Sequence, residues 1–172
     1  MSPQGSESEI VNEARATALL QTFARSFRRN APQVFREFGE EKSTEFVDEM
    51  KFKISAQLFH HHPLNREYYI GKIKMHQDPR ILIRTGEYLE GITHEEVEEA
   101  GSVVFRCGMR SGLHRSSGLP IRLLQKFLEQ GTSRMPARPH WRPMIVEWQS
   151  RSNELGRELR SKLANRIAQD LG

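Results

Sequence analysis

With 172 residues the chain is long enough for one folded domain with its own core, and 37% hydrophobic residues with a mean hydropathy of −0.65 make it a polar one. No stretch approaches the ~20 apolar residues of a membrane-spanning helix, and the first residues lack the basic and apolar regions of a signal peptide, so a cytosolic protein without membrane contact is expected. A single cysteine, Cys107, excludes an intrachain disulfide.

Charge is unevenly distributed along the chain. The net charge is +4, but residues 1–100 carry 13 Lys and Arg against 17 Asp and Glu, whereas residues 101–172 carry 13 against 5. An acidic half and a basic half suit head-to-tail packing of copies around a ring, and a basic face also suits DNA phosphates. Solvated helix surfaces give the same composition, so both interpretations stay open.

The N-terminal part of the chain is expected to be helical in pieces. Residues 1–8 contain Pro3 and Gly5, which predicts a flexible tail ahead of a single domain over 9–172. Helical spacing then begins, with apolar positions at Ile10, Ala14, Ala18, Phe23 and Phe27. Asn30-Ala31-Pro32 is expected to end this helix, and Gly39 to end a short second piece over 33–38.

A further helix is expected from Ser43 to about His60, because apolar residues recur every four positions at Phe46, Met50, Ile54 and Leu58. Pro63 ends it, and Glu67 to Met75 favours a short helix, with a strand as the alternative. The run His60-His61-His62 indicates a polar helix end, since consecutive histidines cannot all face one ion and no acid or cysteine lies at a supporting spacing.

The centre of the chain contains the clearest strand signal. Val103 to Cys107 is β-branched and aromatic, between glycines at 101 and 108. Tyr88 to Glu98 is the adjacent segment for a hairpin, although its glutamates favour a helix by propensity alone. The glutamates between 95 and 99 indicate a solvated acidic face, because a hard-cation site would need a turn glycine among them.

The remaining segments lead to the C-terminus. Residues 109–120 are rich in Ser and Gly and lack apolar periodicity, so a flexible loop is expected, with Arg110 and Arg115 as candidates for facing DNA. Ile121 to Gln130 carries a helical stripe that Gly131 ends. Met144 to Leu171 is expected to form one long helix.

An arm over residues 133–143 joins these two helices and is the most informative part of the chain. Prolines at 136, 139 and 143 remove backbone donors and push the preceding residues towards extended geometry, so the arm is expected to be irregular. Its arginines suit bidentate pairing with carboxylates or phosphates, and its tryptophan is a large apolar anchor. The arm is therefore predicted to dock onto a neighbour, through Arg134, Arg138, Trp141 and Arg142.

Two segments together resemble a known family. ILIRTGEYLEGI, from Ile81 to Ile92, and FLEQGTSRMPARPHWRP, from Phe127 to Pro143, are similar to the neck or tail-completion proteins of long-tailed bacteriophages, also described as head-tail joining or minor tail components. The match covers roughly residues 64–148. Its motif residues are Thr85, Gly86, Gly131, Thr132, Pro136 and Pro139. The family usually has an aromatic and an aliphatic residue after Arg-Pro, where this chain has His140-Trp141.

The resemblance implies an α+β fold, with a small antiparallel β-sheet flanked by helices and a long C-terminal helix, and it favours a strand over Tyr88 to Glu98. It implies a structural virion protein, not an enzyme, at the head-tail junction, assembled in the host cytoplasm. The expected partners are further copies in a ring of six or twelve, other neck, portal-side or tail proteins, and viral DNA passing through the lumen. No cofactor is expected.

The arm and the acidic segment together suggest a subunit contact. Arginines of one arm are expected to reach the acidic residues of the next subunit, foremost Glu95 and Glu96. The alternative is that Arg138 pairs within its own subunit, with Glu129 or Glu147, and only stiffens the arm. Neither Arg138 nor Trp141 lies in the helical stripes, so both are expected outside the core.

Chemical sites find little support in the sequence. No phosphate-binding loop, dinucleotide fingerprint, nucleophile elbow or zinc spacing is present. A nucleophile pair of Cys107 with His114 or His140 would need a stabilised thiolate, and a cysteine in an apolar stretch more often packs as a small hydrophobe. A small nuclease is therefore the weakest interpretation. The main alternative to a virion protein is a basic nucleic-acid-binding protein, suggested by the charge of residues 101–172.

Overall fold

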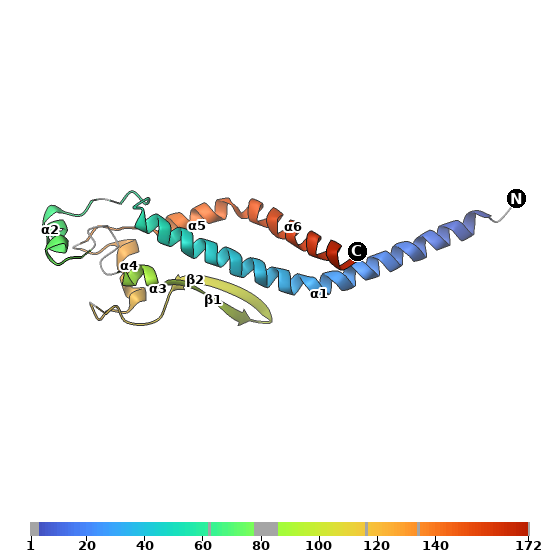
Figure 1. Cartoon of the computed structure of the whole chain (residues 1–172), viewed down its shortest axis with the longest axis horizontal. Coiled ribbons are helices and arrows are strands. Elements are labelled where there is room, and N and C mark those ends of the chain that lie inside the picture. The colour runs from blue at the N-terminus through green and yellow to red at the C-terminus, as the bar shows by residue number, and fades with distance from the viewer. Residues whose placement is uncertain (1–3, 62, 78–85, 116, 134, 172) are drawn as a thin grey trace. The chain divides into compact units, whose positions relative to one another are not determined.

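The computed structural model of the protein describes residues 4–61, 63–77, 86–115, 117–133 and 135–171, with side chains from residue 15 onward. The described residues confirm the expected α+β class, with six helices and a two-stranded antiparallel sheet. In chain order (Figure 1) the elements are α1 (Gln4–Ser55), α2 (Arg66–Lys74), α3 (Glu87–Gly91), β1 (Ile92–Glu99), β2 (Ser102–Met109), α4 (Ile121–Gln130), α5 (Trp141–Ser150) and α6 (Ser152–Leu171).

The chain divides into two compact units. The helical unit contains residues up to Phe38 together with those from Asn153 onward, and the sheet unit contains Gly39–Ser152. Among the described helices, none combines the length and the apolar character that crossing a bilayer requires.

Two long helical segments build the helical unit. Ala31 and Val34 of α1 and Ile167 of α6 are its buried apolar residues. Asp170 near the end of α6 accepts a hydrogen bond from the Ser26 hydroxyl at 2.6 Å and pairs with Arg29. The unit therefore combines a thin apolar contact with ion pairs at its edge.

The expected break at Asn30-Ala31-Pro32 is wrong, because α1 continues through Pro32 as one helix. A proline inside a helix loses one backbone hydrogen bond. Burial of Ala31 and Val34 on either side of Pro32, and the ion pair between Arg166 and Glu37 at 3.3 Å, supply the tertiary contacts that keep the segment helical. Tertiary packing therefore outweighs the helix-breaking tendency of Pro32 at this position.

The expected helix end at Gly39 is also wrong, since Gly39 lies inside α1. A Cβ atom at this position would overlap the ring of Phe105 on β2. The missing side chain of Gly39 thus leaves room on α1 for the ring of Phe105, so the sheet packs closely against the helix at this point. Nearby, Cys107 of β2 donates a weak hydrogen bond to the Ser43 carbonyl oxygen, with 3.9 Å between Sγ and oxygen.

The hairpin has a regular register from Ile92 opposite Met109 to Glu99 opposite Ser102. The expected strand over Tyr88 to Glu98 is therefore confirmed in its second half only. Its first residues form the short helix α3, which starts after Gly86 in a left-handed conformation with φ +78°. The backbone N–H of Glu90 donates to the Gly86 carbonyl oxygen at 3.0 Å, which closes the first turn of this helix.

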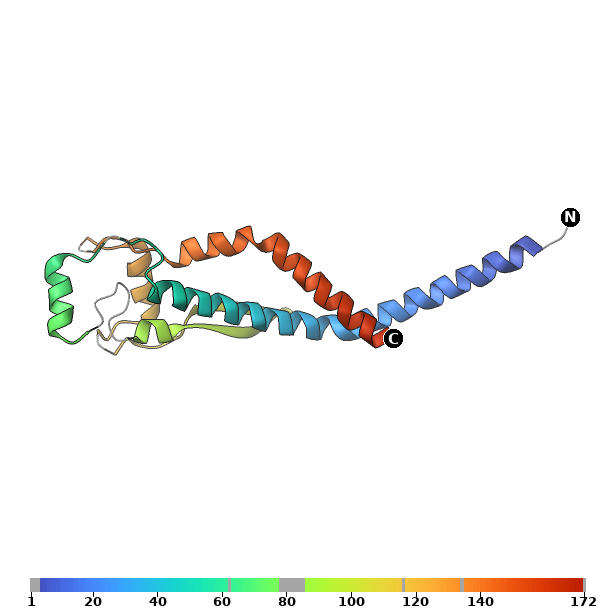
Figure 2. The ribbon, with the colours of Figure 1, turned by 45° about the horizontal axis from the view of Figure 1, so that its top comes forward.

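One core holds the sheet unit together. Its buried members come from α1, α3, the hairpin, α4 and α5, and they are Phe46, Val47, Met50, Ile54, Tyr88, Ile92, Met109, Ile121, Leu128, Trp141 and Met144. Figures 1 and 2 both show α5 beside the second half of α1, with the hairpin along a different side of that helix. The predicted stripe is thus confirmed for Phe46, Met50 and Ile54. It is wrong for Leu58, which lies beyond the end of α1 and is exposed.

The ends of three predicted helices can be compared with the structure. α1 stops at Ser55 instead of His60, because Gln57 adopts a left-handed backbone with φ +58°. The short helix predicted from Glu67 is confirmed as α2, and the side chain of Asn65 caps it by accepting from the backbone N–H of Tyr68 at 2.7 Å. The helix predicted over residues 121–130 is confirmed as α4.

The single helix expected from Met144 to Leu171 is interrupted at Arg151. The guanidinium of Arg151 lies 4.8 Å from the Trp148 ring centre and pairs with Glu45 at 3.1 Å and Glu49 at 3.4 Å. These contacts with α1 fix the residue that separates α5 from α6.

Candidate assembly site

The arm begins with a tight turn that only glycine permits. Gly131 has φ +74°, and a Cβ atom there would lie 2.7 Å from the backbone nitrogen of Ala137. The backbone N–H of Thr132 donates to the Met135 carbonyl oxygen at 2.8 Å and closes the turn. Pro136 at its exit is exposed. Arg134 and Thr85 lie outside the described residues.

Glu129 fixes where the arm ends. One carboxylate oxygen, Oε1, accepts hydrogen bonds from the backbone N–H groups of His140 and Trp141, both at 2.8 Å. These groups stand at the start of α5, where a negative charge also complements the helix dipole. The arm therefore leaves α4 and returns to Glu129, a residue of the same helix.

His140 anchors the arm to the rest of the sheet unit and is completely buried. Because a carbonyl oxygen can only accept, Nδ1 donates to the Arg138 carbonyl oxygen at 3.0 Å, and Nε2 accepts from the Tyr88 hydroxyl at 2.6 Å. Burial lowers the pKa of His140 and raises the pKa of Tyr88, so both groups stay neutral near pH 7.

Trp141 belongs to the core, so the expectation that it lies outside is wrong. Its side chain is buried, and its ring centre lies 6.1 Å from that of Phe46 on α1. Trp141 is the first residue of α5 and, with Met144, forms its buried side. The prolines on either side of Trp141 hide this helix start in the sequence. A role for Trp141 between subunits stays a prediction, and its observed contacts are internal.

Arg138 is also buried, with 8% of its surface exposed, and the expectation for it is wrong in the same way. Its backbone N–H donates to the Leu128 carbonyl oxygen at 2.7 Å, but its side-chain Nε finds no hydrogen-bond partner in the described part of the chain. Burial lowers the pKa of Arg138, although an arginine remains charged at neutral pH.

The two carboxylates expected to pair with Arg138 inside its own subunit are engaged elsewhere. Glu129 binds the start of α5, and Glu147 pairs with Lys53 of α1 at 2.6 Å. No carboxylate among the described ranges pairs with the Arg138 guanidinium. The internal ion pair expected to stiffen the arm is therefore not formed among the described residues.

Other predicted residues of the arm are placed as follows. Arg142 is exposed on the first turn of α5. Pro139 is half-buried, and its carbonyl oxygen accepts from Nε2 of His61 at 2.9 Å. Burial lowers the pKa of His61, and the nearby charge of Arg138 lowers it further. The middle of the histidine run thus serves as a structural contact with the arm.

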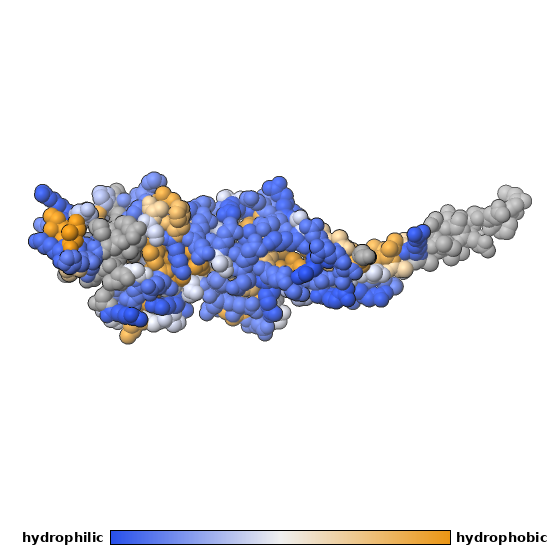
Figure 3. All heavy atoms as spheres, viewed as in Figure 1, coloured by the Kyte–Doolittle hydropathy of each residue, from blue (hydrophilic) through white to orange (hydrophobic). Residues whose placement is uncertain are grey.

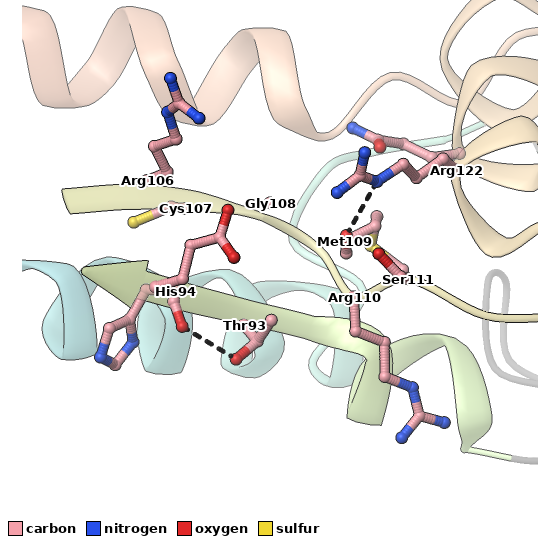
Figure 4. A pocket seen from close by; sticks show the side chains of 11 residues that line it. Thr93, His94, Arg106, Cys107, Gly108, Met109, Arg110, Ser111 and Arg122 are labelled. Atoms are coloured by element: carbon pink, nitrogen blue, oxygen red, sulfur yellow. Dashed lines mark hydrogen bonds between the residues drawn. The ribbon is translucent and has the colours of Figure 1, made fainter. Parts of the chain in front are cut away.

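A second feature of the sheet unit is a hollow of about 440 Å³ between the hairpin and the start of α4. Three arginines line it, namely Arg106, Arg110 and Arg122 (Figure 4). Arg106 pairs with Glu99, and Nε of Arg122 donates to the Met109 carbonyl oxygen at 3.4 Å. The hollow is therefore lined by several basic side chains. The sequence analysis missed it because, of these three arginines, only Arg110 was a predicted site residue.

The predicted acidic residues stand on β1. Glu95 and Glu96 are exposed, and their alternation places them on opposite faces of the hairpin. Glu95 lines the hollow.

The 109–120 loop is packed at two positions, which the expectation of an unpacked segment missed. Met109 belongs to β2, and His114 is buried. Buried Glu87 of α3 accepts two hydrogen bonds from the backbone N–H of Arg115, at 2.9 and 3.0 Å. The Arg115 side chain remains exposed.

Chemical sites are not evident among the side chains described. No group of three or more His, Cys, Asp or Glu residues in the described ranges is placed to hold a metal ion. Burial raises the pKa of the Cys107 thiol, which opposes formation of a thiolate.

No protein-family model, curated protein or solved structure matches the chain. Its function is therefore inferred from its own residues and from the resemblance carried by its two motifs.

Proposed function

We propose that this chain is a structural virion protein of the head-tail junction in a long-tailed phage, where copies form a ring around the DNA channel and complete or attach the tail. One observation carries the proposal beyond the resemblance. The segment that bears the family-like motif is folded, with its turn, cap and anchor accounted for, and it contains the buried cation Arg138, which forms no ion pair with any described residue.

Exposed apolar side chains support an assembling protein. α2 exposes Tyr68, Tyr69, Ile70 and Ile73, and Met75 just after its end is exposed as well. Figure 3 shows an orange, hydrophobic area at the place of α2. In the helical unit, Leu19 and Leu20 of α1 are 65% and 69% exposed. Contiguous exposed apolar residues usually mark contact surfaces.

The mechanism of such a protein is complementarity of shape and charge. Internal hydrogen bonds to Glu129 and His140 hold the arm in place before assembly, so little conformational entropy is lost when a neighbour binds. Each subunit of a ring repeats the same contact, and small gains per contact therefore add up to a stable assembly.

The test is to silence the gene that encodes this chain in the phage that carries it. We expect infected cells to accumulate DNA-filled heads and separate or unfinished tails, with infectivity restored when the chain is supplied from a plasmid. Complete, infectious particles that lack the chain would overturn the proposal.

A basic nucleic-acid-binding protein is the second candidate, and the hollow lined by Arg106, Arg110 and Arg122 is the observation that favours it. Filter binding of duplex DNA to the purified chain in a salt series separates the two. A free DNA-binding protein would show a steep loss of affinity with salt, which Arg110→Gln and Arg122→Gln together would flatten. A junction protein that only surrounds DNA should bind weakly, and the two substitutions should change little.

A further inference from the structure

We propose that Arg138 of one copy of this chain receives Glu95 from the hairpin of a neighbouring copy, and that this pair joins successive subunits. The inference rests on the proposed function, because it names the residues through which identical subunits would close a ring. Among the arginines of the arm and the glutamates of the acidic segment, Arg138 and Glu95 are the two residues proposed to pair.

The first member of the proposed pair is Arg138, a buried cation that no described carboxylate neutralises. Nε of Arg138 is enclosed and has no hydrogen-bond partner, and Glu129 and Glu147 are engaged with other groups. A buried charge without a counter-ion is costly, so a carboxylate that arrives from outside meets donors already held in position.

The surroundings of Arg138 suit a contact between proteins. The charge of Arg138 contributes to the lowered pKa of His61, whose Nε2 donates to the carbonyl oxygen of Pro139 beside Arg138 at 2.9 Å. α2 exposes apolar side chains between charged residues at its two ends, with Tyr69 and Ile73 open to solvent. An apolar rim beside a charged pair excludes water and strengthens the pairing.

The other member of the proposed pair is Glu95, a carboxylate that has no ion-pair partner among the described residues. Glu95 stands opposite Arg106 in the hairpin register, but Arg106 pairs with Glu99 instead. Figure 4 shows Arg110 extending away from the strands. No ion pair involves Glu95 in the part of the chain that the structure describes.

The face of the hairpin that carries Glu95 is open. The opposite face is seated on α1, where Phe105 lies against Gly39 and His94 pairs with Glu40 at 3.1 Å. Val97 lies on the same face as Glu95, two positions along β1, and Val104 stands opposite Val97 on β2. The face thus carries the carboxylate of Glu95, the apolar side chains of Val97 and Val104, and the pair of Arg106 with Glu99. Its carboxylate and its valines suit the cation of Arg138 and the apolar residues of α2.

A second copy is the occupant that these observations favour. One chain presents the cation and the carboxylate on different surfaces, and each lacks a partner within the described residues. Contact between two different surfaces of identical subunits is head-to-tail, and it generates rings when the rotation closes. The neighbouring acids fit less well, since Glu99 is paired and Glu96 and Glu98 have interactions of their own.

The experiment uses the full chain and measures its subunit affinity by mass photometry and sedimentation. Glu95→Arg places a like charge against Arg138, and we expect subunit affinity to fall by at least about 30-fold, as for an interface hot spot. Glu90→Arg, on the exposed surface of α3, is the matched control and should assemble like the unchanged chain. Circular dichroism should show that both variants keep their fold.

Reversal of both charges tests the pair itself. Arg138→Glu alone should block assembly, and Arg138→Glu combined with Glu95→Arg should restore it. Arg138→Met covers the case in which the glutamate prevents folding, because it keeps the buried stem, removes the charge and should still weaken assembly. Failure of the double variant to exceed both single variants, or assembly that Glu95→Arg leaves unchanged, would overturn the inference. A chain that stays monomeric at every concentration would overturn it as well.

The two proposals fail separately. If loss of the chain leaves heads and tails unjoined while Glu95→Arg assembles normally, the junction role stands and the residue pair is wrong. If Arg138 and Glu95 join subunits of a chain that virions do not contain, the pair stands and the junction role is wrong.

Discussion

The two units of this protein are stabilised in different ways. The sheet unit buries eleven residues in one core and carries the arm, the hairpin and the hollow. In the helical unit, the side chains described from residue 15 onward include three buried apolar residues, together with the polar contacts around Asp170. Burial of apolar surface is the dominant stabilising contribution in folded proteins, and exposed ion pairs contribute little. The sheet unit should therefore be the stable part of an isolated subunit, and the helical unit the part that an assembly completes.

The largest effect should come from breaking the core of the sheet unit. Trp141→Ala removes a buried ring and should lower the free energy of unfolding by about 3–5 kcal/mol. Ile145→Ala, at a half-exposed position of the same helix, is the control and should cost far less. Urea unfolding followed by fluorescence and circular dichroism measures both. A Trp141→Ala protein as stable as the control would show that Trp141 is not part of this core.

Glycine substitutions should have the next largest effects on stability, and the effects should be opposite in the two units. Gly131→Ala forces a side chain into a left-handed backbone and against Ala137, and should cost about 2 kcal/mol or more. Gly156→Ala, in α6 of the helical unit, meets open space and should instead stabilise by up to about 1 kcal/mol. Thermal unfolding of the two variants should shift in opposite directions. A shift in the same direction would contradict the assigned backbone geometry.

Acid should weaken the sheet unit through its buried histidines. The folded pKa of His140 and His61 lies below the ordinary value of about 6.5, because burial disfavours the charged form. The unfolded chain then binds more protons below pH 6.5, so the free energy of unfolding falls as pH drops towards the folded pKa. The slope is up to about 1.4 kcal/mol per pH unit for buried His140, and smaller for His61, which is only half-buried and screened by solvent. His140→Gln should flatten this dependence, and His60→Gln, at an exposed position, should leave it unchanged.

The smallest effect should be confined to the helical unit. Asp170 has a pKa lowered to about 2, first through hydrogen bonding with Arg29. Asp170→Asn should therefore speed amide exchange around residues 26–34 and 160–170 while exchange in β1 and β2 stays unchanged. Faster exchange in the hairpin would mean that the units are not independent in stability.

The same contrast explains what could be predicted from the sequence. The stripe of Phe46, Met50 and Ile54, the strand at Val103 and the arm's irregular backbone all follow from local periodicity and proline geometry. The helix ends predicted at Pro32 and Gly39 were wrong because local rules treat each of these residues as a helix breaker. Contacts far apart in the sequence, such as Gly39 with Phe105, decide their actual roles.

The candidate site was predictable in its location but not in its connections. Proline spacing located the arm, yet the cap by Glu129 and the bond between His140 and Tyr88 join residues 11 and 52 positions apart, and no periodic pattern reports such pairs. Burial of Arg138 and Trp141 was missed for the same reason. Their partners lie on α4 and α1, outside the arm itself.

The most direct test of the junction role is a cryo-electron microscopy map of the virion of the phage that encodes this chain. We expect a ring of copies between head and tail, around the DNA channel, with the sheet unit fitting each subunit and Arg138 at the boundary with the neighbouring hairpin. A neck whose density is fully explained by other proteins, with this chain absent or located elsewhere in the particle, would contradict it.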